Sequence, residues 1–159
     1  MVQTRSPAER INAFLASGDH KPEPVGNGGP RAKRARRLTP YEAGLASARA
    51  RAESGEWDGA TGDVLLGLYA HCHEIAYRVL PGELESEWAM AAKRVRQMLG
   101  ADFLGDADAM VEFIKWTWLR EQRRNGSRAN QGDFRIGWRF QFSARMLTDW
   151  RVANAAKKR

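Results

Sequence analysis

The residues best suited to chemistry in this sequence are arginines that alternate with large aromatic side chains near the carboxyl end. The stretch GDFRIGWRFQFSARMLTDW, residues 132–150, holds five aromatics and three arginines, and the basic run REQRRNGSR closely precedes it. The guanidinium group of arginine is a planar fork that binds phosphate through two hydrogen bonds and also stacks on aromatic rings. This combination is typical of a surface that holds a polyanion such as nucleic acid.

Six arginines and two tryptophans make up the predicted nucleic-acid surface. Between residues 106 and 159 arginine outnumbers lysine by nine to three, which favours phosphate contact. Trp116 and Trp118 are two positions apart, so a helix cannot turn both toward one core, and we expect Trp116 at the edge. Trp138 is the other ring expected to be exposed, as a stacking platform beside a basic groove. The members of this surface are Arg120, Arg123, Arg124, Arg128, Arg135, Arg139, Trp116 and Trp138.

The alternative for these arginines is an internal structural role. Acidic side chains at Glu112, Glu121, Asp133 and Asp149 lie in the same third of the chain and could pair with them. Arginine stems can also cover tryptophan rings as part of a core. Under this interpretation the aromatic C-terminal face contacts another polypeptide instead of nucleic acid.

Positive charge is concentrated at the two ends of the chain. The net charge of +7 divides into +5 for residues 1–38, −4 for residues 39–105 and +6 for residues 106–159. A surface shaped only for solubility would intersperse its charges, so the segregation indicates an anionic partner. We expect the N-terminal cluster to be a mobile second contact that raises local concentration. Its members are Arg31, Lys33, Arg34, Arg36 and Arg37.

Other kinds of chemistry find little support in the sequence. In HCHE, His71 and His73 point about 200° apart on a helix, so we expect ordinary surface histidines and no metal site. Cys72 is the only cysteine and cannot form an internal disulfide. The chain has no P-loop, no dinucleotide fingerprint and no constellation of serine, histidine and acid. We therefore expect a non-enzymatic protein without a cofactor.

Two helix starts share the same local chemistry. SPAE at Ser6–Glu9 and TPYE at Thr39–Glu42 each combine a hydroxyl N-cap, a proline and a glutamate that can bond back to the cap. The first helix ends before Gly18 and is so short that it must dock on something to persist. Its apolar residues, the predicted docking face for a partner protein, are Ile11, Phe14 and Leu15.

Helical patterns account for most of the rest of the chain. Apolar residues repeat at helical spacing over residues 63–80 and 83–99, and Asp106 is a suitable N-cap for a helix that reaches residue 124. Residues 134–142 alternate like a half-buried strand, but we favour a helix over most of residues 134–156, because an isolated strand has no partner. If a strand forms, it ends near Phe142, and Ser143 becomes an N-cap.

The sequence therefore predicts an all-α fold. It consists of a short helix in residues 1–17, a flexible basic linker in residues 18–38 and a bundle of four or five helices in residues 39–159. The chain has neither the apolar span of about eighteen residues that a membrane helix needs nor a signal peptide. We expect a cytoplasmic protein without membrane contact.

The segment FIKWTWLREQRRNGSRANQGDFRIGWRFQFSARMLTDWR joins an aromatic helix that becomes basic, a polar turn and a second aromatic helix. It resembles the end of small accessory proteins encoded by phages and other mobile elements, including replication-associated proteins with helix-turn-helix-like or winged-helix domains. The resemblance covers about a quarter of the chain and implies DNA binding. Its loop of about nine residues departs from the three- or four-residue turn of a helix-turn-helix.

Together these features predict a nucleic-acid-binding accessory factor of a phage or mobile-element nucleoprotein complex, with DNA favoured over RNA. The alternative function is a protein adaptor or assembly subunit. Such a subunit would dock through the N-terminal helix and the aromatic C-terminal face.

Overall fold

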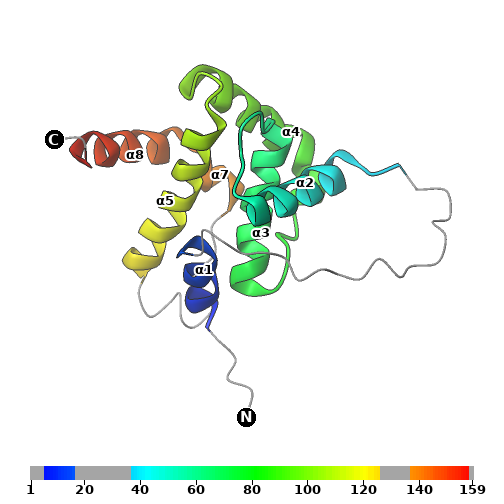
Figure 1. Cartoon of the computed structure of the whole chain (residues 1–159), viewed down its shortest axis with the longest axis horizontal. Helices are drawn as coiled ribbons and strands as arrows, with labels where there is room; N and C mark the ends of the chain where they lie inside the picture. The colour runs from blue at the N-terminus through cyan, green and yellow to red at the C-terminus, as the bar shows by residue number, and fades with distance from the viewer. Residues whose placement is uncertain (1–5, 17–36, 126–136, 158–159) are drawn as a thin grey trace, which may run out of the picture.

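The computed structural model describes residues 6–16, 37–125 and 137–157, which form seven α-helices, one π-helical turn and no β-strand (Figure 1). The predicted all-α fold is confirmed for these residues. The described part of residues 39–159 forms six α-helices where four or five are predicted, and most of the predicted linker lies outside the described residues. The helices are α1 (Pro7–Ala16), α2 (Pro40–Ser54), α3 (Gly62–Tyr77), α4 (Leu84–Gln97), α5 (Ala107–Asn125), α7 (Trp138–Gln141) and α8 (Ala144–Lys157).

Three predicted helix starts are confirmed by their capping bonds. The Ser6 hydroxyl accepts from the Glu9 N–H at 3.2 Å, and the Glu9 carboxylate accepts from the Ser6 N–H at 2.9 Å. Thr39 and Glu42 form the same reciprocal pair at the start of α2. Asp106 accepts from the backbone at the start of α5. These bonds satisfy N–H groups that the first helical turn leaves without partners.

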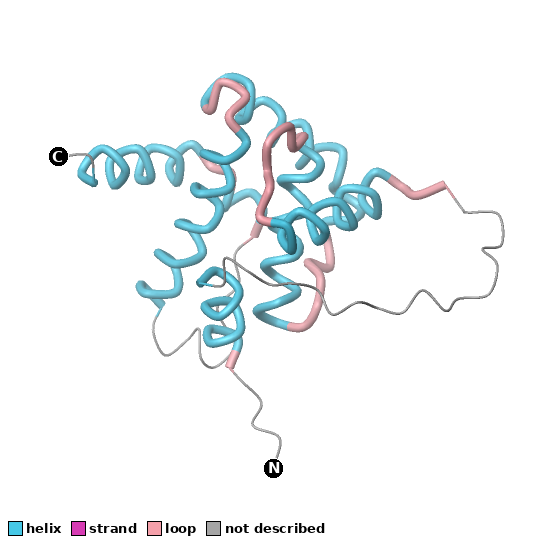
Figure 2. The backbone as a smooth tube through the Cα atoms, viewed as in Figure 1, coloured by secondary structure: helices cyan, strands magenta, loops and turns pink. Residues whose placement is uncertain are grey.

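Helix α3 lies at the centre of the fold, and α1, α2, α4 and α5 pack around it (Figure 2). Eleven of its sixteen residues are buried. A helix that is apolar all round is stable only when other elements cover every side. Helix α7 packs on α4, and α8 packs on α5. The position of α3 therefore fixes the helices that carry the predicted site.

Two glycines make the crossing of α2 and α3 very close. A Cβ atom at Gly67 would lie 2.4 Å from the carbonyl oxygen of Gly44. A Cβ atom at Gly44 would lie 2.7 Å from the carbonyl oxygen of Asp63 and 2.8 Å from the Trp88 ring. Because glycine has no side chain, the two backbones can approach to this distance.

The end of α4 differs from the prediction. The helix is expected to stop at Leu99 before Gly100, but a π-helical turn, η1 (Met98–Asp102), extends it. The Phe103 N–H donates to the Met98 carbonyl at 3.1 Å, and the Gly105 N–H donates to the Leu99 carbonyl at 2.8 Å. Gly105 has φ 81°, which glycine adopts without steric cost, so the turn ends there.

The predicted helix over most of residues 134–156 is divided into α7 and α8. The Ser143 hydroxyl accepts from the Met146 N–H at 3.2 Å and caps α8, although this cap is expected only after a strand and a helix precedes it here. Residues 137–142 form helix and turn, so the strand alternative is wrong for them. Residues 134–136 lie outside the described residues. The break turns α7 onto α4 while α8 packs on α5.

We expect Gly67→Ala to lower the free energy of unfolding by about 1–3 kcal/mol, because the added methyl group must push α2 and α3 apart. At an open helical position the same change stabilises a protein by about 0.5–1 kcal/mol, so the sign of the effect reports the contact. Urea unfolding followed by circular dichroism measures the difference. The matched control is Gly100→Ala, where a Cβ meets nothing within 4 Å. Equal stability of the two variants would contradict the close crossing.

Candidate nucleic-acid interface

Arg120 connects α5 to α8. Its guanidinium forms ion pairs with Asp149 at 2.8 Å and with Glu121 at 3.4 Å, and it donates to the Met146 sulfur at 2.9 Å. The guanidinium carbon also lies 5.4 Å from the centre of the Trp116 ring. These contacts match the alternative in which arginines pair with nearby acids and cover tryptophan rings. Arg120 therefore has a structural role in the described state.

Arg139 and Trp138 on α7 both bind one carboxylate of α4. The Arg139 guanidinium donates two hydrogen bonds of 3.0 Å to Glu87, one to each oxygen, and the Trp138 Nε1 donates to the same group at 2.6 Å. The guanidinium also stacks on the Trp138 ring, 4.5 Å from its centre. The hydrogen bonds from Arg139 first, and from Trp138 second, lower the pKa of Glu87 below its ordinary value. The pair docks α7 on α4.

The other arginines of the predicted surface, and the N-terminal cluster, lie only partly within the described residues. Arg123 is exposed near the end of α5 and has no hydrogen bond or ion pair with any described residue. Arg124 follows in the last turn of α5, and Arg37 is exposed before α2. The predicted residues that lie outside the described ranges are Arg128, Arg135, Arg31, Lys33, Arg34 and Arg36.

The two predicted stacking rings are less exposed than expected. Trp116 and Trp138 are both partly buried and pack against the core. Trp118 is completely buried, which agrees with the expectation that only one of the paired tryptophans faces the core. The correction follows from tertiary packing, because α8 covers one side of α5 and α4 receives α7.

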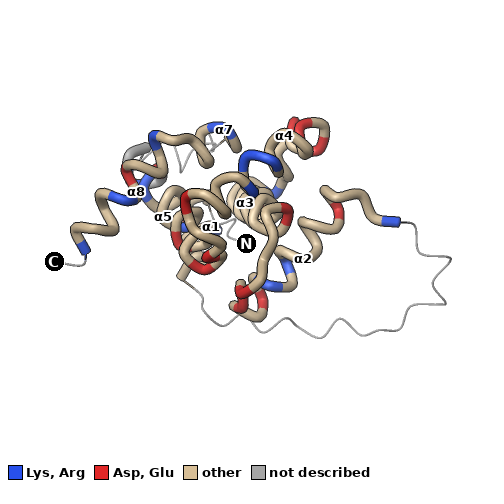
Figure 3. Tube along the Cα trace, turned by 90° about the horizontal axis from the view of Figure 1, so that it is seen from above, with Lys and Arg blue, Asp and Glu red and all other residues tan. Residues whose placement is uncertain are grey.

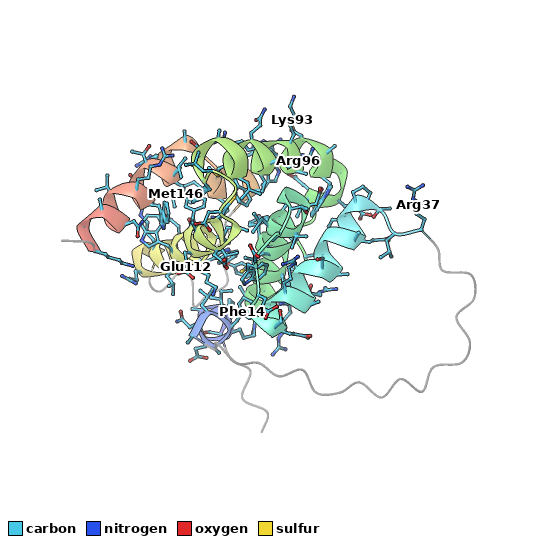
Figure 4. All side chains as sticks on the ribbon, turned by 45° about the horizontal axis from the view of Figure 1, so that its top comes forward. Phe14, Arg37, Lys93, Arg96, Glu112 and Met146 are labelled. Atoms are coloured by element: carbon cyan, nitrogen blue, oxygen red, sulfur yellow. The ribbon has the colours of Figure 1, made fainter. Side chains whose placement is uncertain are left out.

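The structure adds cations of α4 that the sequence analysis did not select. Arg94 Nε donates to the Phe142 carbonyl at 2.9 Å, which places the basic run of α4 beside the junction of α7 and α8. Lys93 is exposed and points away from the body of the molecule (Figure 4). Arg145 is exposed in the first turn of α8. We call this set the α4–α8 surface: Lys93, Arg94, Arg139 and Arg145.

The sequence signal for this surface was the run KRVR at residues 93–96. The net charge of −4 over residues 39–105 conceals this local positive cluster. The third cation of the run, Arg96, pairs with Asp63 at 3.3 Å. The contact between α4 and α7 could not be predicted either, because Glu87 and Trp138 are about fifty positions apart in the sequence.

Acidic residues gather on a different side of the molecule. A cavity of about 350 Å³ lies between α1, the end of α2 and the start of α5, with Phe14 in its lining. The exposed carboxylates of Asp106, Asp108 and Glu112 also line it. In Figure 3, α1 and α7 lie on different sides of α3.

The predicted partner-docking residues of α1 pack within this chain. Ile11 is 2% exposed and belongs to the main core, and Phe14 and Leu15 are partly buried against that core. The Phe14 ring meets the edge of His71 at 5.2 Å between centres. Arg10 donates to the carbonyl of Ile75, at the end of α3, at 3.0 Å. The structure thus corrects the expectation of a free docking face, since α1 already packs against the core of its own chain.

The histidines and the cysteine of α3 do not form a site. His73 is buried and its Nδ1–H donates to the Val79 carbonyl at 2.6 Å, so its expected position at the surface is wrong. Burial raises the pKa of the Cys72 thiol to about 12, which keeps it protonated and unreactive. Within the described ranges, no three histidine, cysteine or acidic residues are placed to hold a metal ion. No helix there is long and apolar enough to cross a bilayer.

Comparison with protein-family models, curated proteins and solved structures finds no match to this chain. The resemblance to phage and mobile-element accessory proteins therefore stays a prediction. A functional interpretation depends on the residues of the chain itself.

We expect Glu87→Gln to lower the urea midpoint of unfolding at about pH 7, because the charged acceptor of Arg139 and Trp138 is lost. The folded-state pKa of Glu87 is depressed, so its contribution is complete above the ordinary value of 4.5 and disappears as the pH falls through the folded value. The midpoints of the variant and the wild type should converge in acid. The control is Glu85→Gln, an exposed acid on the same helix. A difference that stays constant from neutral to acidic pH would refute the role of this carboxylate.

Proposed function

We propose that this chain is a non-enzymatic accessory factor that binds nucleic acid, with DNA favoured over RNA, through the α4–α8 surface. The supporting observation is that Lys93 and Arg145 are exposed and make no ion pair with any described residue. They come from helices that are distant in sequence, and the bond from Arg94 to the Phe142 carbonyl ties α4 to the turn just before α8. This surface extends the arginine-rich C-terminal surface that the sequence predicts.

A cation that already pairs with a carboxylate binds phosphate less well than a cation that has no such partner. Arg120 already has a carboxylate at 2.8 Å, so it contributes little net positive potential. Lys93 and Arg145 lack such a partner, and Arg123 at the end of α5 resembles them in this respect. Cations without a carboxylate neutralise phosphates directly and release the counterions condensed on nucleic acid. The chain as a whole has a net charge of +7, which favours the same encounter.

The N-terminal cluster supplies a second contact in this proposal. Its cations precede α2, where Arg37 is exposed next to the Thr39 cap. A second site on the same chain binds at a high effective concentration once the first site is occupied. The adaptor alternative has less support, because Ile11 of α1 is buried in the core of this chain.

The decisive experiment removes Lys93 and Arg145, which have no ion pair with a described residue. We expect Lys93→Ala with Arg145→Ala to weaken binding to all duplex sequences alike and to reduce the slope of log K against log salt by about 2, since each residue neutralises about one phosphate. Fluorescence anisotropy of a labelled duplex over a series of salt concentrations measures both quantities. The matched control is Arg78→Asn, which removes an exposed charge at the end of α3 and tolerates the left-handed φ of 58° at that position.

Three outcomes count against the proposal. A double variant with the affinity and salt slope of the wild type would exclude the α4–α8 surface. A loss of binding only on changing Arg123, Arg124 and Arg128 to alanine would place the site at the end of α5 instead. Absence of wild-type binding to duplex and single-stranded probes at low salt would refute the function itself.

A further inference from the structure

Three N–H donors of α7 converge on one carboxylate. The Trp138 Nε1 lies 2.6 Å from one oxygen of Glu87, and the two terminal nitrogens of Arg139 lie 3.0 Å from its two oxygens. The stacking of the guanidinium on the indole ring fixes the donors relative to each other. A fork of arginine donors with a third N–H beside it suits an oxyanion, and its geometry matches phosphate as well as carboxylate.

The occupant of this site can be exchanged. The side chain of Arg139 is 58% exposed and that of Glu87 is 24% exposed, so solvent and ligands reach the pair. Exposed ion pairs contribute only about 0–1 kcal/mol to stability. An external phosphate that is brought close to Arg139 therefore competes with the internal carboxylate on similar terms.

A second observation on α7 opposes its docked position. Gln141 is completely buried, and neither atom of its amide group forms a hydrogen bond with a described residue. A buried polar atom without a partner costs about 1–3 kcal/mol. The docked state of α7 is thus stabilised at the surface by Glu87 and destabilised in the core by Gln141. The helix has only four residues and is separated from α8 by the turn at Phe142 and Ser143.

From these contacts we propose that Trp138 and Arg139 form a binding site for one phosphate group of a nucleic acid, which the Glu87 carboxylate occupies until that phosphate displaces it. The proposal rests on the proposed function and specifies how the α4–α8 surface is regulated. Docking of α7 on Glu87 and binding of phosphate by Arg139 exclude each other. Changes that weaken docking therefore raise affinity, and changes that strengthen docking lower it.

The first test weakens docking. We expect Glu87→Gln to raise the affinity for a labelled DNA duplex about threefold more than Glu85→Gln does, which corresponds to the modest strength of an exposed ion pair. Glu85→Gln removes the same charge from the same helix, so it measures the general electrostatic gain. Equal gains in the two variants would overturn the proposed site while leaving the proposed function intact.

The second test strengthens docking. Gln141→Met keeps a side chain of similar length and removes the unpaired amide, so we expect a higher urea midpoint together with weaker DNA binding. Opposite changes in stability and affinity distinguish a docking equilibrium from general damage to the fold. A stabilised variant with unchanged affinity would contradict the exchange.

A third measurement does not need nucleic acid. Titration with inorganic phosphate, followed by the indole N–H resonance of Trp138, should shift that resonance at lower phosphate concentration in Glu87→Gln than in the wild type. Trp138→Phe assigns the resonance, and Glu85→Gln again serves as the control. No shift in Glu87→Gln would overturn the phosphate site even if the chain does not bind DNA. A shift without any DNA binding would support the site and refute the proposed function.

Discussion

The absence of a side chain at Gly44 is the constraint on which the rest of the structure depends. At this position α2 lies against the start of α3 and the Trp88 ring of α4, each within 3 Å of where a Cβ would be. The Trp88 Nε1 donates to the Asp63 side chain at 2.9 Å, which fixes α4 on α3. The orientation of α4 then decides where Glu87 receives α7 and where Lys93 points. A close contact of backbones in the core thus determines the arrangement of charges at the surface.

Segregated charge has a local cause as well as a functional meaning. Helix α4 has Glu85 and Glu87 in its first turn and Arg94 and Arg96 in its last turn. The helix dipole favours this order of signs in any protein, by about 0.3–1 kcal/mol for each charge. Segregation along one helix is therefore weak evidence for a ligand. The informative feature is that the Arg94 guanidinium bonds to the Phe142 carbonyl and so joins α4 to the turn before α8, which no dipole requires.

The sequence predicted what local chemistry controls and missed what tertiary contacts control. The caps at Thr39 and Asp106 were predictable because a hydroxyl or carboxylate bonds to a backbone N–H three residues away. The partner of Arg139 was not predictable, because Glu87 lies 52 positions earlier and meets it only after α7 folds back on α4. The packing of α1 on its own chain was not predictable either. An amphipathic helix has the same sequence pattern whether its apolar face contacts its own chain or another.

The guanidinium of Arg139 cannot bind two anions through the same pair of N–H donors. Glu87 therefore makes the proposed site selective among anions. A carboxylate on the same chain has a high effective concentration at Arg139, so a free phosphate in solution competes poorly with it. A polymer that Lys93 and Arg145 already hold presents its next phosphate at a comparable effective concentration. Arg139 is then released only to a ligand that carries several phosphates in a row. In this proposal the internal ion pair discriminates a polyanion from single anions by the number of contacts and not by shape.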